Sequence, residues 1–277
     1  MEILLNTIML EPRRWNQPKS VTVPLIDILS DIKKVGFDGL EIWGYHIWNM
    51  KKDELFSLSR ALRARDMIAP SVGSYLTDQG GSDRQGILNA AKRYFSLCEK
   101  LDSKRLRIFY GNKNFEESSQ DYLKFIDEVF EEIFNLAKDK GIKVMAEMHA
   151  GTVISSPEGL ERAIEKWKGL LGLSLVYQPY KFRTDSALEV LDVALEHIGS
   201  VHIQNQHNDI HVALSEGDVD YRRILARLAS SGYQGPFVLE FTAGVTSSSV
   251  DFDYRHILSS AAKDREWLTA TWRKINE

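Results

Sequence analysis

The sequence predicts an α/β protein that folds as a single (β/α)8 TIM barrel, and three observations support this prediction. Eight short apolar runs alternate with longer helical patterns from one end of the chain to the other. Several helical patterns end in a glycine that lies a few residues before the next apolar run. The chain has 277 residues and no low-complexity linker, which suits one barrel domain spanning residues 1–277.

The apolar runs have the length and composition of buried strands. The predicted strands are residues 2–8, 39–43, 67–75, 105–110, 143–149, 173–178, 200–205 and 236–241. The clearest helical patterns, with apolar residues three and four apart, are residues 23–36, 53–66, 121–141 and 220–232. Gly36, Gly141 and Gly232 follow three of these helices, and each is expected to adopt a left-handed conformation there.

Alternating strands and helices imply parallel strands joined by crossover helices. A doubly wound open sheet is the alternative to a closed barrel. The segment after the first strand, "NTIMLEPRRW", lacks a glycine-rich phosphate fingerprint. The dinucleotide-binding form of the open sheet is therefore disfavoured.

Composition excludes several classes of protein. The chain is 43% hydrophobic and 27% charged, as is ordinary for globular proteins. No window approaches the roughly 18 consecutive apolar residues of a membrane span, and Glu11, Arg13 and Arg14 interrupt the first apolar run. We therefore expect a cytoplasmic protein that does not bind membranes.

Charge and cysteine content narrow the possible partners further. The formal net charge of −4 and the absence of a basic segment argue against binding to nucleic acids. Cys98 is the only cysteine, which excludes intramolecular disulfides and thiolate metal clusters. Its place in an amphipathic helical pattern predicts a packing role.

Three predicted strands end in a carboxylate after similar segments. "KKVGFDGLEIW", "KDKGIKVMAEM" and "ASSGYQGPFVLEF" place Glu41, Glu147 and Glu240 at strand ends. In a parallel barrel these ends converge on one rim, where side chains from distant parts of the chain meet. Other polar residues at these ends are His149, Gln178, Lys181, His202, Gln204, Asn205 and His207.

Carboxylates, an imidazole and an amide oxygen form a site suited to Mn²⁺, Mg²⁺, Co²⁺ or Zn²⁺. Such an ion polarises a carbonyl or hydroxyl oxygen while a carboxylate moves a proton at the neighbouring carbon. This chemistry suits sugars, polyols and keto-sugars.

Four segments carry a resemblance to a known family. These are "GFDGLEIW", "MAEMHAG", "SVHIQN" and "LSEGDVDYRRILARLASSGYQGPFVLEF". The last is similar to a Gly-x-Gly-x-(Ile/Val)-Asp, helix, Gly-Tyr-x-Gly, strand, Glu pattern, with Ser215 replacing the first glycine. The chain thereby resembles, over essentially its whole length, the xylose isomerase-like TIM barrels of sugar phosphate isomerases and epimerases. The family includes ketose 3-epimerases, hydroxypyruvate isomerase and inosose dehydratase, and belongs to the AP endonuclease family 2 superfamily.

The resemblance implies a metal site with one departure from the family pattern. The family's ligands on strands five, seven and eight correspond to Glu147, His202 and Glu240. Gln178 stands where strand six usually supplies an aspartate, and Lys181 stands near the position of a usual histidine. Replacing a carboxylate by an amide removes one negative charge, so we expect the divalent ion to bind weakly.

The resemblance also implies a reaction. Glu147 and Glu240 resemble the acid and base that work on opposite faces of an enediolate intermediate in isomerases and epimerases, and dehydration is a related outcome. The substrate is expected to be a small sugar or polyol. Candidate substrate-binding residues are His149, Lys181, Gln204, His207, Trp43, His46 and Arg107, and Trp15 and Trp48 are further candidates for stacking on a sugar ring.

Two other functions compete with this hypothesis. The substitutions at Gln178 and Lys181 also suit a non-catalytic or metal-independent sugar-binding relative. A metal-dependent abasic-site endonuclease is disfavoured, because "SVGSYLTD" and "RLRIFYG" lack the histidines of its trinuclear site. The aromatic C-terminal segment "EWLTATWRKINE" is expected to pack on its own barrel or on another subunit of a homodimer or homotetramer.

Overall fold

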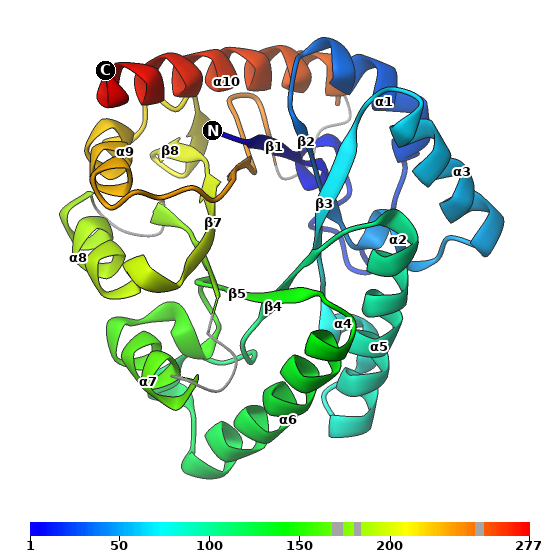
Figure 1. The fold of residues 1–277 in the computed structure, drawn as a ribbon, viewed down its shortest axis with the longest axis vertical. Coiled ribbons are helices and arrows are strands. Elements are labelled where there is room, and N and C mark those ends of the chain that lie inside the picture. Colours follow the sequence, from blue (N-terminus) through cyan, green and yellow to red (C-terminus); the bar gives the residue numbers. More distant parts are fainter. Residues whose placement is uncertain (168–173, 180–183, 247–251) are drawn as a thin grey trace.

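The computed structural model describes residues 1–167, 174–179, 184–246 and 252–277. Its main feature is a closed barrel of parallel strands in the order β1-β10-β7-β6-β5-β4-β3-β2, which confirms the predicted fold class (Figure 1). The barrel strands are β1 (Ile3–Asn6), β2 (Gly39–Trp43), β3 (Ile68–Gly73), β4 (Arg105–Phe109), β5 (Lys143–Glu147), β6 (Leu175–Tyr177), β7 (Ile198–Ile203) and β10 (Phe237–Leu239).

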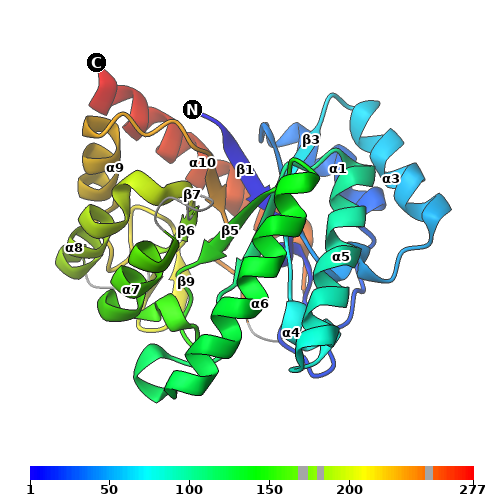
Figure 2. The same ribbon diagram turned by 60° about the horizontal axis from the view of Figure 1, so that its bottom comes forward.

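Helices surround the barrel and cover the outer face of its strands (Figures 1 and 2). Apolar residues line the inward face of each long helix, as the sequence pattern predicts. The α-helices are α1 (Leu25–Lys34), α2 (Tyr45–Trp48), α3 (Lys52–Arg63), α4 (Leu76–Gly80), α5 (Arg84–Leu101), α6 (Gln120–Asp139), α7 (Pro157–Trp167), α8 (Thr184–Ala194), α9 (Tyr221–Ser230) and α10 (Tyr254–Asn276). None of the described helices is both long enough and apolar enough to cross a membrane.

Local signals in the sequence fix where helices begin and end. Ser119 and Asp83 accept hydrogen bonds from backbone N–H groups in the first turns of α6 and α5. Gly36, Gly141 and Gly232 have φ values of 81°, 63° and 75°, so the predicted left-handed conformation after α1, α6 and α9 is confirmed. Each turn then directs the chain into the next strand.

The C-terminal helix packs on its own barrel. Trp272 of α10 contacts Phe237 of β10, with ring centroids 5.0 Å apart. Both chain ends lie at the amino-terminal end of the barrel, where Met1 and Asn276 line one hollow (Figure 2). The predicted packing of the aromatic segment on the chain's own barrel is thus observed.

The predicted strand at residues 200–205 is interrupted by a small antiparallel hairpin. β7 ends at Ile203, and β8 (Asn205–His207) pairs with β9 (Ile210–Val212). Asn208 and Asp209 connect them with positive φ values of 51° and 60°. Asparagine and aspartate tolerate this turn geometry well, so the pair "ND" is the local signal for the hairpin.

His46 makes part of the stability of the barrel dependent on pH. It lies in α2, is 4% exposed and packs against Trp43 in a T-shaped arrangement. Its Nε2 lies 3.3 Å from the carbonyl oxygen of Thr7. Burial lowers its pKa to about 4, against the smaller opposing effects of the Thr7 hydrogen bond and the charge of Glu11. The folded protein therefore resists protonation of His46, whereas the unfolded chain accepts the proton near pH 6.5.

We predict that the free energy of unfolding falls as pH decreases from 6.5 towards 4. His46 accounts for at most about 3 kcal/mol of this loss, at 1.36 kcal/mol per pKa unit. Denaturant unfolding of the wild type and His46→Gln at pH 7, 6, 5 and 4 measures it. The variant should lose less stability over this interval, and parallel pH profiles for the two proteins would contradict the assignment.

Candidate functional site

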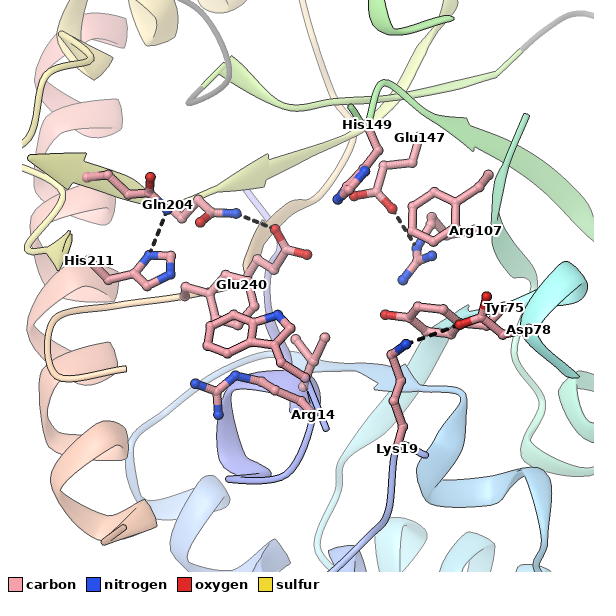
Figure 3. Close-up of a pocket in the computed structure, with 15 residues that line it drawn as sticks. Arg14, Lys19, Tyr75, Asp78, Arg107, Glu147, His149, Gln204, His211 and Glu240 are labelled. Carbon is pink, nitrogen blue, oxygen red and sulfur yellow. Dashed lines mark hydrogen bonds and ion pairs between the residues drawn. The ribbon is translucent and has the colours of Figure 1, made fainter. Parts of the chain in front are cut away.

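The carboxyl ends of the barrel strands enclose a cavity of about 420 Å³ (Figure 3). This volume is within the range of small-molecule sites. Its charged and polar lining mixes cations and anions, and its walls are largely aromatic. The lining residues are Ile8, Arg14, Trp15, Lys19, Tyr75, Asp78, Arg107, Phe109, Glu147, His149, Gln204, Gln206, His211, Glu240 and Phe241.

Glu147, His202 and Glu240 form a buried cluster at the base of this cavity. Their nearest ligand atoms all lie within 4.8 Å of one another. Glu147 is the last residue of β5, His202 lies in β7, and Glu240 follows β10 directly. Barrel closure brings these residues together, because β10 pairs with β7 and β6 joins β7 to β5.

Glu41 fixes the orientation of His202. Its Oε1 lies 2.9 Å from Nε2 of His202 and accepts a hydrogen bond of 2.9 Å from Asn6 Nδ2. Its Oε2 accepts a 2.7 Å hydrogen bond from Ser71. With Nε2 held in this way, Nδ1 of His202 faces Glu147 at 3.5 Å and Glu240 at 3.6 Å. A buried carboxylate behind a metal-ligating imidazole is a common supporting arrangement in metal sites.

Arg107 supplies the positive charge closest to Glu147. It points into the barrel from β4, and its Nε lies 2.9 Å from Glu147 Oε2, with both side chains at most 2% exposed. Its Nη1 donates a 3.0 Å hydrogen bond to the carbonyl of Ser74, and the guanidinium lies over the rings of Tyr75 and Phe109. Gly73 leaves room for it, because a Cβ there would lie 2.6 Å from Arg107 Nη2.

Gln178 lies among the three members of the cluster. It follows β6 and is fully buried. Its Nε2 donates to Glu147 Oε1, lies 3.1 Å from His202 Nδ1 and donates to Glu240 Oε2 at 3.4 Å. Gln204 is a second amide donor to Glu240 Oε2.

These contacts shift the protonation equilibria of the cluster. Burial raises the pKa values of Glu41 and Glu147, but His202 and Arg107 outweigh this effect and lower both. Burial lowers the pKa of His202, but the surrounding carboxylates raise it well above its ordinary value. A metal ion bound at Nδ1 would require the neutral ring, whose remaining proton would lie on Nε2, 2.9 Å from Glu41 Oε1.

The cluster fits a divalent metal ion in its donor chemistry. Glu147 and Glu240 supply carboxylate oxygens, and Nδ1 of His202 supplies an imidazole nitrogen. The Oε1 atom of Gln178 is buried and has no hydrogen-bond partner, so a fourth oxygen donor is available in the same place. Its amide nitrogen, however, is the atom that faces the cluster.

Two aromatic walls flank the cluster. On one side Trp15, His211 and Phe241 contact one another, with the Trp15 and His211 rings 7° from parallel. On the other side Phe109 lies between Tyr75 and His149, at centroid distances of 5.6 and 5.0 Å. Flat walls of this kind suit the apolar faces of a sugar ring.

A buried carboxylate holds the loop that carries Trp15. Glu11 is fully buried and accepts hydrogen bonds from the backbone of Arg13, Thr22 and Val23 and from the Thr22 hydroxyl. Arg14 donates to the Glu11 carbonyl and stacks over the Trp15 ring at 4.1 Å. The sequence did not predict this role of Glu11.

The structure brings most of the predicted site residues together. Glu147, Glu240, Arg107, His149 and Gln204 line the cavity, and Figure 3 shows the first two pointing into it from different strands. Gln178 and His202 contact Glu147 from beneath. Lys181 lies outside the described residues.

Three predicted substrate-binding residues do not reach the cavity. Trp43 is 1% exposed and packs against Tyr45 and Tyr75, and His46 is buried next to Trp43. His207 lies outside because the hairpin carries it away from the end of β7. There its exposed ring contacts Asp218 at 2.7 Å. Direct contact between these residues and a cavity ligand is therefore not supported.

Two further candidates, Asn205 and Trp48, make contacts that stabilise the fold. Asn205 donates to the carbonyls of Leu214 and Val219 and accepts from Val219 N–H, so it holds the loop before α9. Trp48, at the end of α2, packs against Tyr94 of α5. Neither residue lines the cavity.

Sequence reasoning missed several lining residues because they lie outside the strands that the sequence predicts. Lys19 and Asp78 form an ion pair of 3.1 Å at the rim, and Lys19 lies over the rings of Tyr45 and Tyr75. His211 enters the wall because the hairpin turns the chain back towards the cavity. The "ND" turn was the available signal for His211.

Comparison with known proteins identifies relatives of this fold. The model of the xylose isomerase-like TIM barrel family matches residues 29–271. No curated protein matches the sequence. A probable 3-DHS dehydratase involved in petrobactin synthesis from Bacillus anthracis is similar in structure, with a TM-score of 0.77, 16% identity, and coverage of 97% of this chain and 99% of that chain.

Two other solved structures are similar at the same level of identity. D-psicose 3-epimerase with D-tagatose from Clostridium cellulolyticum H10 has a TM-score of 0.75, 16% identity and 100% coverage of both chains. A xylose isomerase-like TIM barrel protein from Mycobacterium smegmatis in complex with magnesium has a TM-score of 0.75, 16% identity, and coverage of 100% of this chain and 98% of that chain. From the family match over residues 29–271 and the closed barrel that carries it, we conclude that the chain belongs to the xylose isomerase-like TIM barrel family.

Proposed function

We propose that this protein is an isomerase or epimerase that acts on a sugar, polyol or keto-sugar by proton transfer through an enediolate. The observation that carries the proposal is the pair Glu147 and Glu240, which enter one cavity from β5 and from the end of β10 and share His202. Relatives of the same fold include an epimerase with D-tagatose and a probable dehydratase, which supports sugar-like substrates and a related chemistry.

The two carboxylates suit a reaction that removes a proton and returns it. One carboxylate takes the proton from the carbon next to a carbonyl, and the electron pair of the broken C–H bond moves towards the carbonyl oxygen. The other, as a carboxylic acid, returns a proton to the opposite face of that carbon in epimerisation. In isomerisation a proton is added to the neighbouring carbon, and the hydroxyl proton of the first carbon moves to the former carbonyl oxygen. If the intermediate instead expels a β-hydroxyl group as water, the outcome is dehydration.

Other residues of the cavity bind and orient the substrate. Gln204 and Arg107 present hydrogen-bond donors beside the two carboxylates, and Arg107 stabilises the anionic form of Glu147. The walls containing Trp15 and Phe109 cover the ring of the substrate and exclude water. Glu147, His202, Glu240 and the amide oxygen of Gln178 would hold a divalent ion, which would polarise the carbonyl oxygen.

A non-catalytic or metal-independent sugar-binding protein is the second candidate function. The observation that favours it is that Glu147 already has protein partners for both oxygens, Gln178 and Arg107. Calorimetric binding of a sugar without metal, together with no turnover of a broad sugar panel, would support this alternative. Metal-dependent turnover would exclude it.

We predict that Glu147→Gln and Glu240→Gln each reduce kcat by about 10²–10⁴-fold, since an amide cannot exchange the proton. A panel of keto-sugars and polyols identifies the substrate, and incorporation of deuterium from D2O at the reacting carbon reports the proton transfer. Both variants should lose deuterium incorporation along with turnover.

Glu128→Gln is a matched control, because Glu128 is half exposed on α6 and pairs with Arg84. Its kcat should equal that of the wild type. Wild-type turnover and deuterium incorporation in Glu240→Gln would refute the acid and base assignment.

We also predict that Glu41→Gln weakens Mn²⁺ binding by about 10- to 100-fold, the usual effect of losing a carboxylate behind a ligating histidine. The physical reason is that Glu41 anchors Nε2 of His202 and so points Nδ1 at the other ligands. Isothermal titration calorimetry of Mn²⁺ into chelator-treated protein measures the change. An affinity equal to that of Glu128→Gln would show that Glu41 has no such role.

A further inference from the structure

The amide group of Gln178 lies at the centre of the proposed metal site. Its nitrogen contacts Glu147, His202 and Glu240, the three residues whose ligand atoms lie within 4.8 Å of one another. An ion shared by these three residues must lie within reach of the same atoms. The amide nitrogen and such an ion therefore compete for one position.

The orientation of this amide follows from its charged neighbours. Two carboxylates converge on it, so the end that carries N–H donors is stabilised when it faces them, and the carbonyl end would be repelled. The Oε1 atom is consequently turned away, buried and without a hydrogen-bond partner. A buried hydrogen-bond acceptor without a partner destabilises the folded protein. In this orientation the Oε1 atom of Gln178 therefore lacks the hydrogen bond or metal ion that would stabilise it.

A divalent cation reverses this preference. With positive charge between Glu147 and Glu240, the N–H groups are repelled and the Oε1 atom becomes a favourable ligand. Rotation about the last side-chain torsion exchanges the two ends of the amide without changing its volume. One glutamine thus serves two states of the site.

We propose that Gln178 is a two-position element, whose amide nitrogen holds Glu147 and Glu240 together in the metal-free protein and whose amide oxygen ligates the divalent ion after the amide rotates. This inference rests on the metal-site assignment of the proposed function. A carboxylate at this position would serve only the metal-bound state. The glutamine therefore stabilises the metal-free protein and lowers the affinity for metal.

The test measures Mn²⁺ affinity by calorimetry and the melting temperature in EDTA for the wild type, Gln178→Glu and Gln178→Met. Glutamate has the same size and two oxygens, so Gln178→Glu should bind Mn²⁺ at least about tenfold more tightly. It should also melt at least about 3 °C lower than the wild type in EDTA and regain this difference in Mn²⁺. Methionine has neither donor nor oxygen, so Gln178→Met should melt lower in EDTA and bind Mn²⁺ more weakly than the wild type.

Gln206→Glu is the matched control for added charge. Gln206 lines the same cavity but contacts His211 through its amide, and none of its described contacts reaches the three ligands. Its Mn²⁺ affinity and its melting temperature in EDTA should change by less than those of Gln178→Glu. A comparable change would show that the effect is general electrostatics of the cavity.

Three further results would overturn the proposal. These are a Gln178→Glu variant that binds Mn²⁺ no more tightly than the wild type, one that melts in EDTA at the wild-type temperature, and a Gln178→Met variant that binds Mn²⁺ more tightly than the wild type. None of these measurements uses a sugar. The proposal can therefore fail while the sugar reaction is confirmed, and it can hold when no substrate turns over.

Discussion

The crowding of three buried carboxylates at the carboxyl end of the barrel is the constraint on which the rest of the site depends. Glu41, Glu147 and Glu240 are each at most 6% exposed. Buried anions are strongly unfavourable unless hydrogen bonds and opposite charges compensate them. His202 lies between all three, Arg107 pairs with Glu147, and amide or hydroxyl donors meet the remaining oxygens.

This requirement also explains features beyond the cluster. The guanidinium of Arg107 reaches Glu147 only because β3 has a glycine beside it, at Gly73. Tyr75 and Phe109 cover the guanidinium and at the same time form one wall of the cavity. Charge compensation at the base and the shape of the binding cavity are thus determined by the same side chains.

Gln178, directly after β6, changes the charge balance of the site from what an aspartate there would give. An aspartate there would add a fourth anion, which only a cation could stabilise. Gln178 instead adds hydrogen-bond donors without adding charge. Arg107 then neutralises the charge of Glu147. The chain combines a donor set suited to a divalent ion with groups that stabilise the same set without one.

The order of elements, the closed barrel and the strand ends near which Glu147, His202 and Glu240 lie could be predicted from the sequence. These features depend on periodicity and on local signals such as Gly36 and Gly141, which act within a few residues. Which atoms meet became visible only in the folded chain. Examples are the contact of Glu41 with His202, the inward orientation of the Gln178 amide nitrogen, and the entry of His211 in place of His207. The first two contacts join strands that are distant in the chain, so their geometry depends on barrel register. The "ND" turn signals the hairpin that carries His211, but where this hairpin lies against the cavity depends on the folded chain.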